Sequence, residues 1–384
     1  MSDAALVERL RRRLAAGTSE PTAQSVAEAL RAENQLFGNG TVLRLVDELR
    51  RETRGTGPLD PVLATPGVTD VLVNGPDAVY LDRGQGLERV DDVRFGDDDA
   101  VRRLAQRLAA QAGRRLDDAS PWVDARLPDG TRLHAVLAPL ARPGTLLSLR
   151  VPARRSFTLE QLVDAGTLST GAAQLLGRVV EARVAFVVSG GTGSGKTTLL
   201  AAMLARVPPR ERVVIVEDAT ELRPDHPHVV GLEARPANVE GAGLVTVRDL
   251  VRQALRMRPD RLVVGEVRGA EVVDLLAALN TGHEGGCGTV HANSAGDVPA
   301  RFEALGVAAG LPREAVHSQL AASLDLVVHL DRDRDGRRRL AQLAVLVADG
   351  GIVRCVPAVT YAGGTHRGEG HDRLASLLDA HGSR

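Results

Sequence analysis

Lysine is almost absent from this 384-residue chain, since Lys196 is the one lysine among 48 basic residues. Arginine serves wherever a position needs only a positive charge. Lys196 is therefore expected to be retained for its geometry, because a compact ammonium on a thin stem fits where a planar guanidinium does not. Aromatic residues make up only 2% of the chain, so we expect a core of Leu, Val and Ala and few rings for stacking on nucleic-acid bases.

Cysteine is also scarce, and no long apolar run is present. Cys287 and Cys355 lie too far apart for a C-x-x-C motif, which predicts a reducing compartment and no zinc site. The N-terminus lacks the apolar region of a signal peptide, and no run approaches the roughly 20 apolar residues of a spanning helix. The sequence therefore predicts a soluble cytoplasmic protein that reaches membranes only through a partner. The net charge of −1 argues against a basic nucleic-acid-binding face and against a strongly acidic tail.

A glycine-rich segment carries the strongest motif in the chain. It matches G-x-x-x-x-G-K-[ST] and lies between an apolar run over 184–188 and a predicted helix over 198–204. In this context backbone N–H groups bind phosphate oxygens of ATP, and the following helix adds its positive end. The expected nucleotide-binding residues are Gly190, Gly191, Thr192, Gly193, Ser194, Gly195, Lys196, Thr197 and Thr198.

Two other interpretations of this segment are weaker. A dinucleotide-binding turn requires G-x-G-x-x-G, but Lys196 stands where the third glycine would be. A chance glycine turn before a helix would not supply the lysine. We therefore expect Lys196 to reach the β- and γ-phosphates and the hydroxyl of Thr197 to bind Mg²⁺.

The chain divides by pattern into a helical extension over 1–55, an α+β domain over 56–152, a linker over 153–158 and an α/β domain over 159–384. The extension is either a helical cap or an arm that docks a partner. In the second segment two hairpins and a strand surround a helix at 98–112. The last segment alternates strand and helix, as a parallel sheet requires. The remaining expectations are strands at 185–189, 212–217, 261–265 and 288–291, helices at 196–206, 246–257 and 270–279, a solvated hairpin tip or acidic-partner site at 331–339, and a loose link at 363–370.

Two apolar runs end in carboxylates. The first delivers Glu217 and Asp218 to the carboxyl end of its strand, where α/β sheets bind ligands. Glu217 is expected to orient or activate water, with Asp218 and Glu221 near the metal, although Asp218 also suits a helix N-cap. The second run ends at Glu266, which is expected to bind Mg²⁺ through water. Gly265 occupies the position where such strands often carry an aspartate.

A third segment brackets glycines between two histidines, His283 and His291. Such a loop suits detection of the terminal phosphate of a nucleotide. The rival interpretation is metal ligation, but no further Cys or His completes a tetrahedral set.

At these motifs the sequence resembles the TadA/CpaF branch of the secretion ATPase superfamily. The segments GGTGSGKTT, VIVEDATEL, LRMRPDRLVVGEVRG and TGHEGGCGTVHANS look like its Walker A, Asp box, Walker B and His box, in that order. The likeness covers about residues 56–330. The eight positions between His283 and His291 resemble TadA/CpaF and type IV secretion members, and the absence of a four-cysteine motif differs from type II members.

The resemblance implies a RecA-like P-loop NTPase domain after a smaller α+β domain. It further implies a hexameric cytoplasmic ATPase that uses ATP and Mg²⁺, docks on an inner-membrane platform protein, and powers pilus assembly or secretion. Carried over by motif position, Glu217 is the catalytic carboxylate, Glu266 the Walker B acid, and His283 with His291 the His box. Arginines of the N-terminal domain are expected to close over the nucleotide, with Arg132 and Arg150 as candidates and Arg126 in reserve.

Two alternatives to a motor remain open. A nucleotide-gated scaffold with little turnover is suggested by Gly265 at the Walker B aspartate position. A conjugation-type nucleic-acid transfer ATPase is suggested by relatives of this superfamily, although the near-neutral net charge and few aromatics disfavour it.

Overall fold

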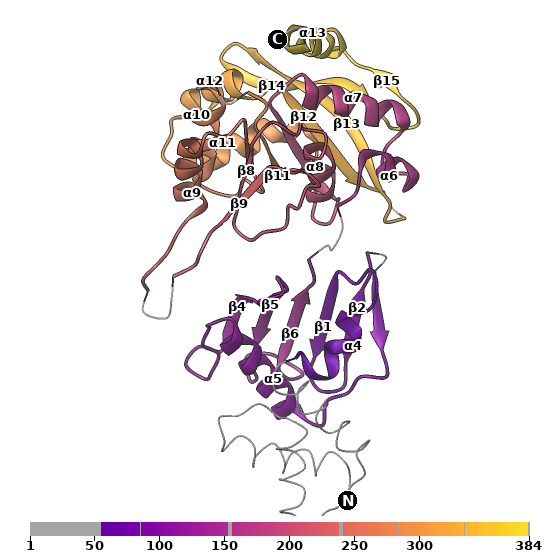
Figure 1. Ribbon diagram of the computed structural model, residues 1–384, viewed down its shortest axis with the longest axis vertical. Coiled ribbons are helices and arrows are strands. Elements are labelled where there is room, and N and C mark those ends of the chain that lie inside the picture. The colour runs from indigo at the N-terminus through magenta and orange to yellow at the C-terminus, as the bar shows by residue number, and fades with distance from the viewer. Residues whose placement is uncertain are drawn as a thin grey trace, which may run out of the picture. The chain divides into compact units, whose positions relative to one another are not determined.

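The computed structural model describes residues 55–84, 86–152, 156–237, 241–282, 284–333 and 335–382. The chain forms two compact units, Met1–Pro152 and Ala153–Arg384 (Figure 1). The helical extension predicted over 1–55 lies outside the described residues except for its last position. Across the described ranges, no helix is both long and apolar enough to cross a bilayer.

The described part of the first unit is a six-stranded antiparallel sheet with helices on one face. Helix α5 begins after Asp97, whose side chain accepts a hydrogen bond from the N–H of Ala100. One face of α5 packs on alternate sheet residues in a core of Val and Leu. The strands, in the order β3-β2-β1-β6-β5-β4, are β1 Asp70–Asn74, β2 Val79–Asp82, β3 Leu87–Val90, β4 Trp122–Arg126, β5 Arg132–Val136 and β6 Leu146–Arg150; the helices are η1 Gly57–Leu59, α4 Asp60–Leu63 and α5 Asp98–Gln111.

In the second unit, the described residues form a nine-stranded sheet in the order β15-β14-β13-β12-β7-β11-β10-β8-β9. The strands from β12 to β9 run parallel, and β13 to β15 extend the sheet antiparallel. The parallel strands are almost continuously apolar because both faces are covered. They are β7 Phe186–Gly190, β8 Val213–Glu217, β9 Val229–Glu233, β10 Arg261–Val264, β11 Cys287–His291 and β12 Leu326–Arg332, followed by β13 Arg338–Asp349, β14 Ile352–Thr360 and β15 His366–Arg367.

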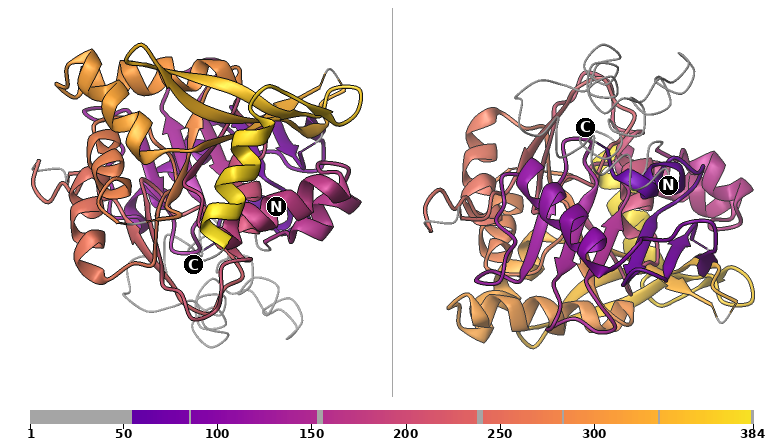
Figure 2. Two further views of the ribbon diagram at one scale, coloured as in Figure 1. Left: turned by 90° about the horizontal axis from the view of Figure 1, so that it is seen from above. Right: turned by 90° about the horizontal axis from the view of Figure 1, so that it is seen from below.

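Two layers of helices cover this sheet. One core cluster joins the sheet to α6 Leu159–Asp164, α7 Thr170–Glu181, α8 Lys196–Leu204 and α13 His371–Gly382. The other joins it to α9 Val247–Ala254, α10 Glu271–Leu279, α11 Val298–Ala308 and α12 Arg313–Ser323. Helix α13 lies against α7 and β14, as the left view of Figure 2 shows. The short 3-10 helices are η2 Leu255–Met257 and η3 Ala295–Asp297.

The strands and helices predicted in both units are confirmed within one or two residues at most ends, and the helix predicted to 257 ends in η2. The prediction for 363–370 is wrong. Instead of a loose link, β15 pairs with β14 there. A Cβ atom on Gly368 would lie 2.2 Å from the carbonyl oxygen of Pro357, so this glycine permits close packing rather than mobility.

A buried ionic cluster fixes the edge at which the parallel strands begin. The Nε of Arg261 donates to Glu211 at 2.7 Å, and its Nη2 donates to the carbonyl oxygen of Val180 at 2.9 Å. Arg183 pairs with the same carboxylate at 2.9 Å. Burial opposes ionisation of Glu211, but the two guanidinium bonds outweigh it and lower the pKa. The cluster thereby ties α7, β10 and the segment before β8 together.

We expect Glu211→Ala to lower the free energy of unfolding of the second unit by about 3–5 kcal/mol, because Arg261 would remain buried without its counter-charge. Glu181→Ala is the matched control. Its exposed pair with Arg206 contributes less than about 1 kcal/mol. Denaturant unfolding of both variants measures the difference, and equal losses would contradict the structural role of the cluster.

Candidate active site

The segment 191–195 forms a tight loop between β7 and α8, at the carboxyl edge of the parallel strands. Gly193 and Gly195 adopt φ angles of 72° and 95°, which glycine tolerates and other residues rarely adopt. A Cβ atom on Gly190 would lie 2.5 Å from the carbonyl oxygen of Leu330. Among the described side chains none caps the first turn of α8, so its N–H groups are available to an anion. The loop therefore fits a phosphate group.

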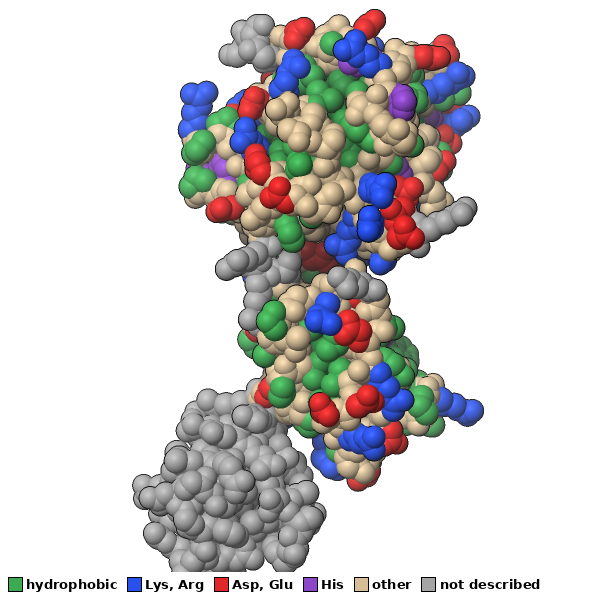
Figure 3. Space-filling view, turned by 90° about the vertical axis from the view of Figure 1, so that its right-hand side faces the viewer, with side chains coloured by type: hydrophobic (Ala, Val, Ile, Leu, Met, Phe, Trp, Pro, Cys, Tyr) green, Lys and Arg blue, Asp and Glu red, His purple; other side chains and the backbone are tan. Residues whose placement is uncertain are grey.

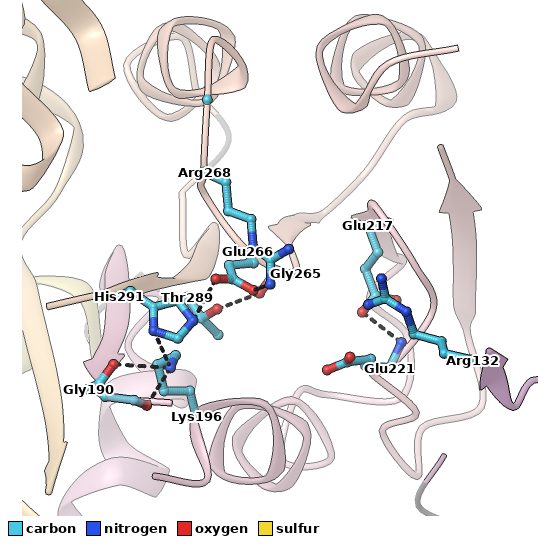
Figure 4. Close-up of polar contacts among 12 residues, drawn as sticks. Arg132, Gly190, Lys196, Glu217, Glu221, Gly265, Glu266, Arg268, Thr289 and His291 are labelled. Carbon is cyan, nitrogen blue, oxygen red and sulfur yellow. Dashed lines mark hydrogen bonds and ion pairs between the residues drawn. The ribbon is translucent and has the colours of Figure 1, made fainter. Parts of the chain in front are cut away.

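Lys196 extends from α8 across this loop. Its ammonium donates to the carbonyl oxygens of Gly190 at 3.0 Å and Gly191 at 2.9 Å, and lies 3.4 Å from Nδ1 of His291 (Figure 4). Burial lowers the pKa of Lys196, and the negative charge of Glu266 opposes that effect. The ammonium of Lys196 thus lies against the loop, where phosphate oxygens would replace the two carbonyl oxygens as its hydrogen-bond acceptors.

His291 connects this lysine to the carboxylate that follows β10. Its Nε2 lies 2.7 Å from Oε1 of Glu266, and Arg268 pairs with the same carboxylate (Figure 4). Burial, followed by the charge of Lys196, lowers the pKa of His291 and favours the neutral ring. Because an ammonium has only donors, a neutral ring would face Lys196 with Nδ1 as the acceptor. The structure therefore joins three predicted residues, Lys196, His291 and Glu266, in one cluster.

Glu217 ends β8 and is buried against the neighbouring strand. Its Oε1 accepts hydrogen bonds from the N–H groups of Glu221 at 3.0 Å and Leu222 at 2.9 Å. Burial raises the pKa of Glu217 to about 7, against the opposing effect of those two bonds. A Cβ atom on Gly265 would lie 2.5 Å from Cγ of Glu217. Glycine at the expected aspartate position therefore makes room for the carboxylate of β8.

The candidate metal ligands lie around the same edge. Thr197 is in the first turn of α8, and Glu266 follows β10. Asp218 is exposed, and its alternative role as a helix N-cap is wrong because no helix is present over 218–228. Within the described ranges, no group of three or more His, Cys, Asp or Glu side chains forms a metal cluster. A metal here would accordingly depend on phosphate oxygens and water for its remaining ligands.

His283 lies outside the described residues, and the described positions that follow it are at the other edge of the sheet from His291. The carbonyl of Gly286 accepts the N–H of Phe186, and that of Gly285 contacts buried Arg261. Those contacts are at the edge where β7, β10 and β11 begin, whereas His291 is at the end of β11. Participation of His283 in the site stays a prediction.

The arginines predicted in the first unit lie in one row across its sheet. Register pairs Arg126 with Arg132 and Arg132 with Arg150, and Arg150 with Asp70. They alternate with buried residues, so they occupy the face opposite α5. Arg132 pairs with Asp124 at 3.5 Å and Arg150 with Asp70 at 3.3 Å. The row therefore holds arginines and carboxylates together, and its role at the nucleotide stays a prediction.

Sequence reasoning missed two arginines that contact the site. Arg268 pairs with Glu266, and Nε of Arg338 donates to the carbonyl oxygen of Gly193 at 3.0 Å. The segment 331–339 is a hairpin tip between β12 and β13 as predicted, but Arg338 is not simply solvated. The motif around Glu266 contains Arg268, whereas nothing in the sequence links Arg338 to the phosphate loop.

A family model described as "Type II/IV secretion system protein" matches residues 52–363. The chain belongs to this family. It is 61% identical over 327 residues to a putative conjugal transfer protein of Mycobacterium tuberculosis, covering 84% of this chain and 93% of that protein. It is 34% identical over 314 residues to the type IV secretion system protein PtlH homolog of Bordetella bronchiseptica, covering 74% and 92%.

The solved structures of this family confirm the predicted fold class. The chain resembles the pilus retraction motor PilT with bound ADP, with a TM-score of 0.50 and 19% identity over 82% of this chain and 85% of that one. The chain therefore has a RecA-like domain after a smaller α+β domain. Membership of this family also implies nucleotide binding.

Glu217→Gln is expected to stabilise the protein at alkaline pH. With its folded pKa raised to about 7, Glu217 binds more protons in the folded state, so stability falls as pH rises from about 4.5 to 7. A neutral glutamine keeps the acceptor for both N–H groups and avoids this loss. We expect a gain of about 1–3 kcal/mol at pH 8, falling below about 1 kcal/mol at pH 5. Unfolding midpoints that match at pH 8 would contradict this assignment.

Proposed function

We propose that this secretion ATPase is an ATP-hydrolysing motor that powers pilus assembly or protein secretion. The contact of His291 with both Lys196 and Glu266 carries the proposal, because it groups a phosphate-binding ammonium, a polar ring and a carboxylate at the carboxyl edge of the sheet. A passive phosphate site would need only the loop and the lysine.

Each residue has a definite role in this proposal. The N–H groups of the loop and Lys196 bind the phosphates of ATP. Thr197 and Glu266 would hold Mg²⁺, Glu266 through water, and the ion would supply positive charge against the phosphates. Glu217, with a pKa of about 7, accepts a proton from the attacking water, since a base is most effective near the working pH. Neutral His291 orients Glu266 and responds to whether the terminal phosphate is present.

The proposal extends to the assembly. Its motifs assign the chain to the TadA/CpaF branch. In this proposal it acts as a homo-hexamer in the cytoplasm and docks on an inner-membrane platform protein. In that assembly Arg132 and Arg150 supply positive charge to the nucleotide phosphates, and Arg126 extends their row. Planar guanidinium groups suit such oxygens because they donate two parallel hydrogen bonds. His283 is assigned to the same nucleotide response.

Lys196→Ala is expected to reduce ATP hydrolysis by the purified protein at least about 100-fold, as loss of an essential charge stabiliser does. Lys196→Arg should be nearly as inactive, because a planar guanidinium does not fit between the carbonyls of Gly190 and Gly191. Release of phosphate with the platform protein present provides the measurement. Near-normal turnover in Lys196→Arg would show that geometry is not the reason for this lysine.

Glu266→Gln separates a motor from a nucleotide-gated scaffold. Loss of the carboxylate is expected to abolish turnover while ATP still binds, so a motor should lose pilus assembly or secretion in cells. A scaffold that only binds ATP should keep it. Retained assembly despite absent hydrolysis would overturn the motor proposal.

A nucleic-acid transfer ATPase is the second candidate, favoured by the conjugal-transfer name of the Mycobacterium relative. On the face in Figure 3, acidic and basic side chains intermingle over the described surface instead of forming one basic stripe, which disfavours this function. DNA-stimulated hydrolysis with a steep salt dependence would favour it over the motor.

A further inference from the structure

The hairpin between β12 and β13 lies directly beside the phosphate loop. Strand β12 pairs in parallel with β7, and its Leu330 is in register with Gly190. The chain continues through Arg332 before it turns back into β13 at Arg338. The register alone therefore brings the base of the hairpin alongside 191–195.

Two arginine side chains of this hairpin approach the loop. The Nε of Arg338 donates to the carbonyl oxygen of Gly193 at 3.0 Å, and its Cδ would lie 3.3 Å from a Cβ on Gly195. An Nη atom of Arg332 would lie 3.9 Å from a Cβ on Gly193. The Nε of Arg332 donates to the carbonyl oxygen of Gly336 at 2.9 Å, within the hairpin. The two hydrogen bonds to Gly193 and Gly336 each use the Nε–H donor of an arginine, and each guanidinium has five N–H donors in all.

Register places the same two arginines directly opposite one another on β12 and β13. Like charges in such a cross-strand pair repel, so the pair costs free energy in the absence of an anion. The flanking pair is different, because Asp331 faces Arg339 and the charges are complementary. Repulsion is thus confined to the two positions that approach the phosphate loop, where an anionic ligand would relieve it.

The strand order decides which end of a nucleotide the hairpin faces. Strand β12 borders β7 on one side, and β11 and β10 follow β7 on the other. Glu266 and His291, the residues assigned to the hydrolysed phosphate, belong to the β10 and β11 side. Arg332 and Arg338 therefore face the part of the nucleotide away from the bond that breaks.

We propose that Arg332 and Arg338 form a clamp for the α- and β-phosphates, the portion that ADP shares with ATP. The inference rests on the proposed function, since it assigns these residues to the same nucleotide site. It makes the hairpin a determinant of nucleotide affinity and of product retention. It gives these two arginines no part in the hydrolytic step.

The test compares ADP and ATP binding by calorimetry, together with steady-state ATP hydrolysis, in the full-length protein. Arg332→Ala and Arg338→Ala should each weaken binding of both nucleotides about tenfold, as loss of a charged hydrogen bond does. The KM for ATP should rise by a similar factor, and kcat should stay within about twofold. Arg338→Lys keeps the charge and should recover part of the affinity.

Arg354→Ala is the matched control. This exposed arginine of the same sheet pairs with Asp349 at 3.5 Å, near the opposite end of β13, and its loss should leave both affinities unchanged. A change in apo-protein stability without a change in affinity would identify Arg338 as a brace for the loop and overturn the clamp. Weaker binding of ATP alone, or an effect of Arg338→Ala without one of Arg332→Ala, would also overturn it.

The same binding experiment distinguishes failure of the arginine clamp from failure of the proposed ATPase function. If Lys196→Ala abolishes nucleotide binding while both hairpin variants bind normally, the ATP site stands and the clamp is refuted. If the wild-type protein binds neither nucleotide, both proposals fail together.

Discussion

The parallel pairing around β7 is the constraint on which the rest of the site depends. Residues from four separate motifs meet because β7, β8, β10 and β11 end at the same edge of one sheet. Backbone hydrogen bonds set that register, and apolar residues on both faces hold it, since a one-residue slip would exchange the two faces. This pairing, rather than contacts among the side chains, sets the positions of Lys196, His291, Glu217 and Glu266.

Close packing then determines which side chains fit at the carboxyl edge of the parallel strands. Gly265 leaves the space that Glu217 fills, so two neighbouring strands supply only one buried carboxylate between them. Burial raises the pKa of that carboxylate to about 7, a free-energy cost to the fold that suits a group which exchanges protons. At the opposite edge, Arg261 and Glu211 are buried too, but mutual pairing keeps their charges. Paired charges serve the structure there, whereas the carboxylate of Glu217 is held by two backbone N–H donors.

Strand register also brings arginines opposite one another. Opposed arginines occur in the row of Arg132 and Arg150 on the first unit and in the pair of Arg332 and Arg338 beside the loop. In the first unit, carboxylates compensate the repulsion between the opposed arginines, since Arg132 pairs with Asp124 and Arg150 with Asp70. Beside the phosphate loop, by contrast, Arg332 and Arg338 face one another directly across β12 and β13.

The sequence by itself determined the α/β class, the alternation of strand and helix, and the loop around Lys196, because periodicity and glycine-rich turns are local properties. It also identified Glu217, Glu266 and His291 by motif. Only the tertiary structure decided that Gly265 accommodates Glu217 and that Arg338 meets Gly193, 145 positions away in the chain. Those contacts depend on which strands become neighbours, and strand order arises from packing of the whole sheet rather than from any local pattern.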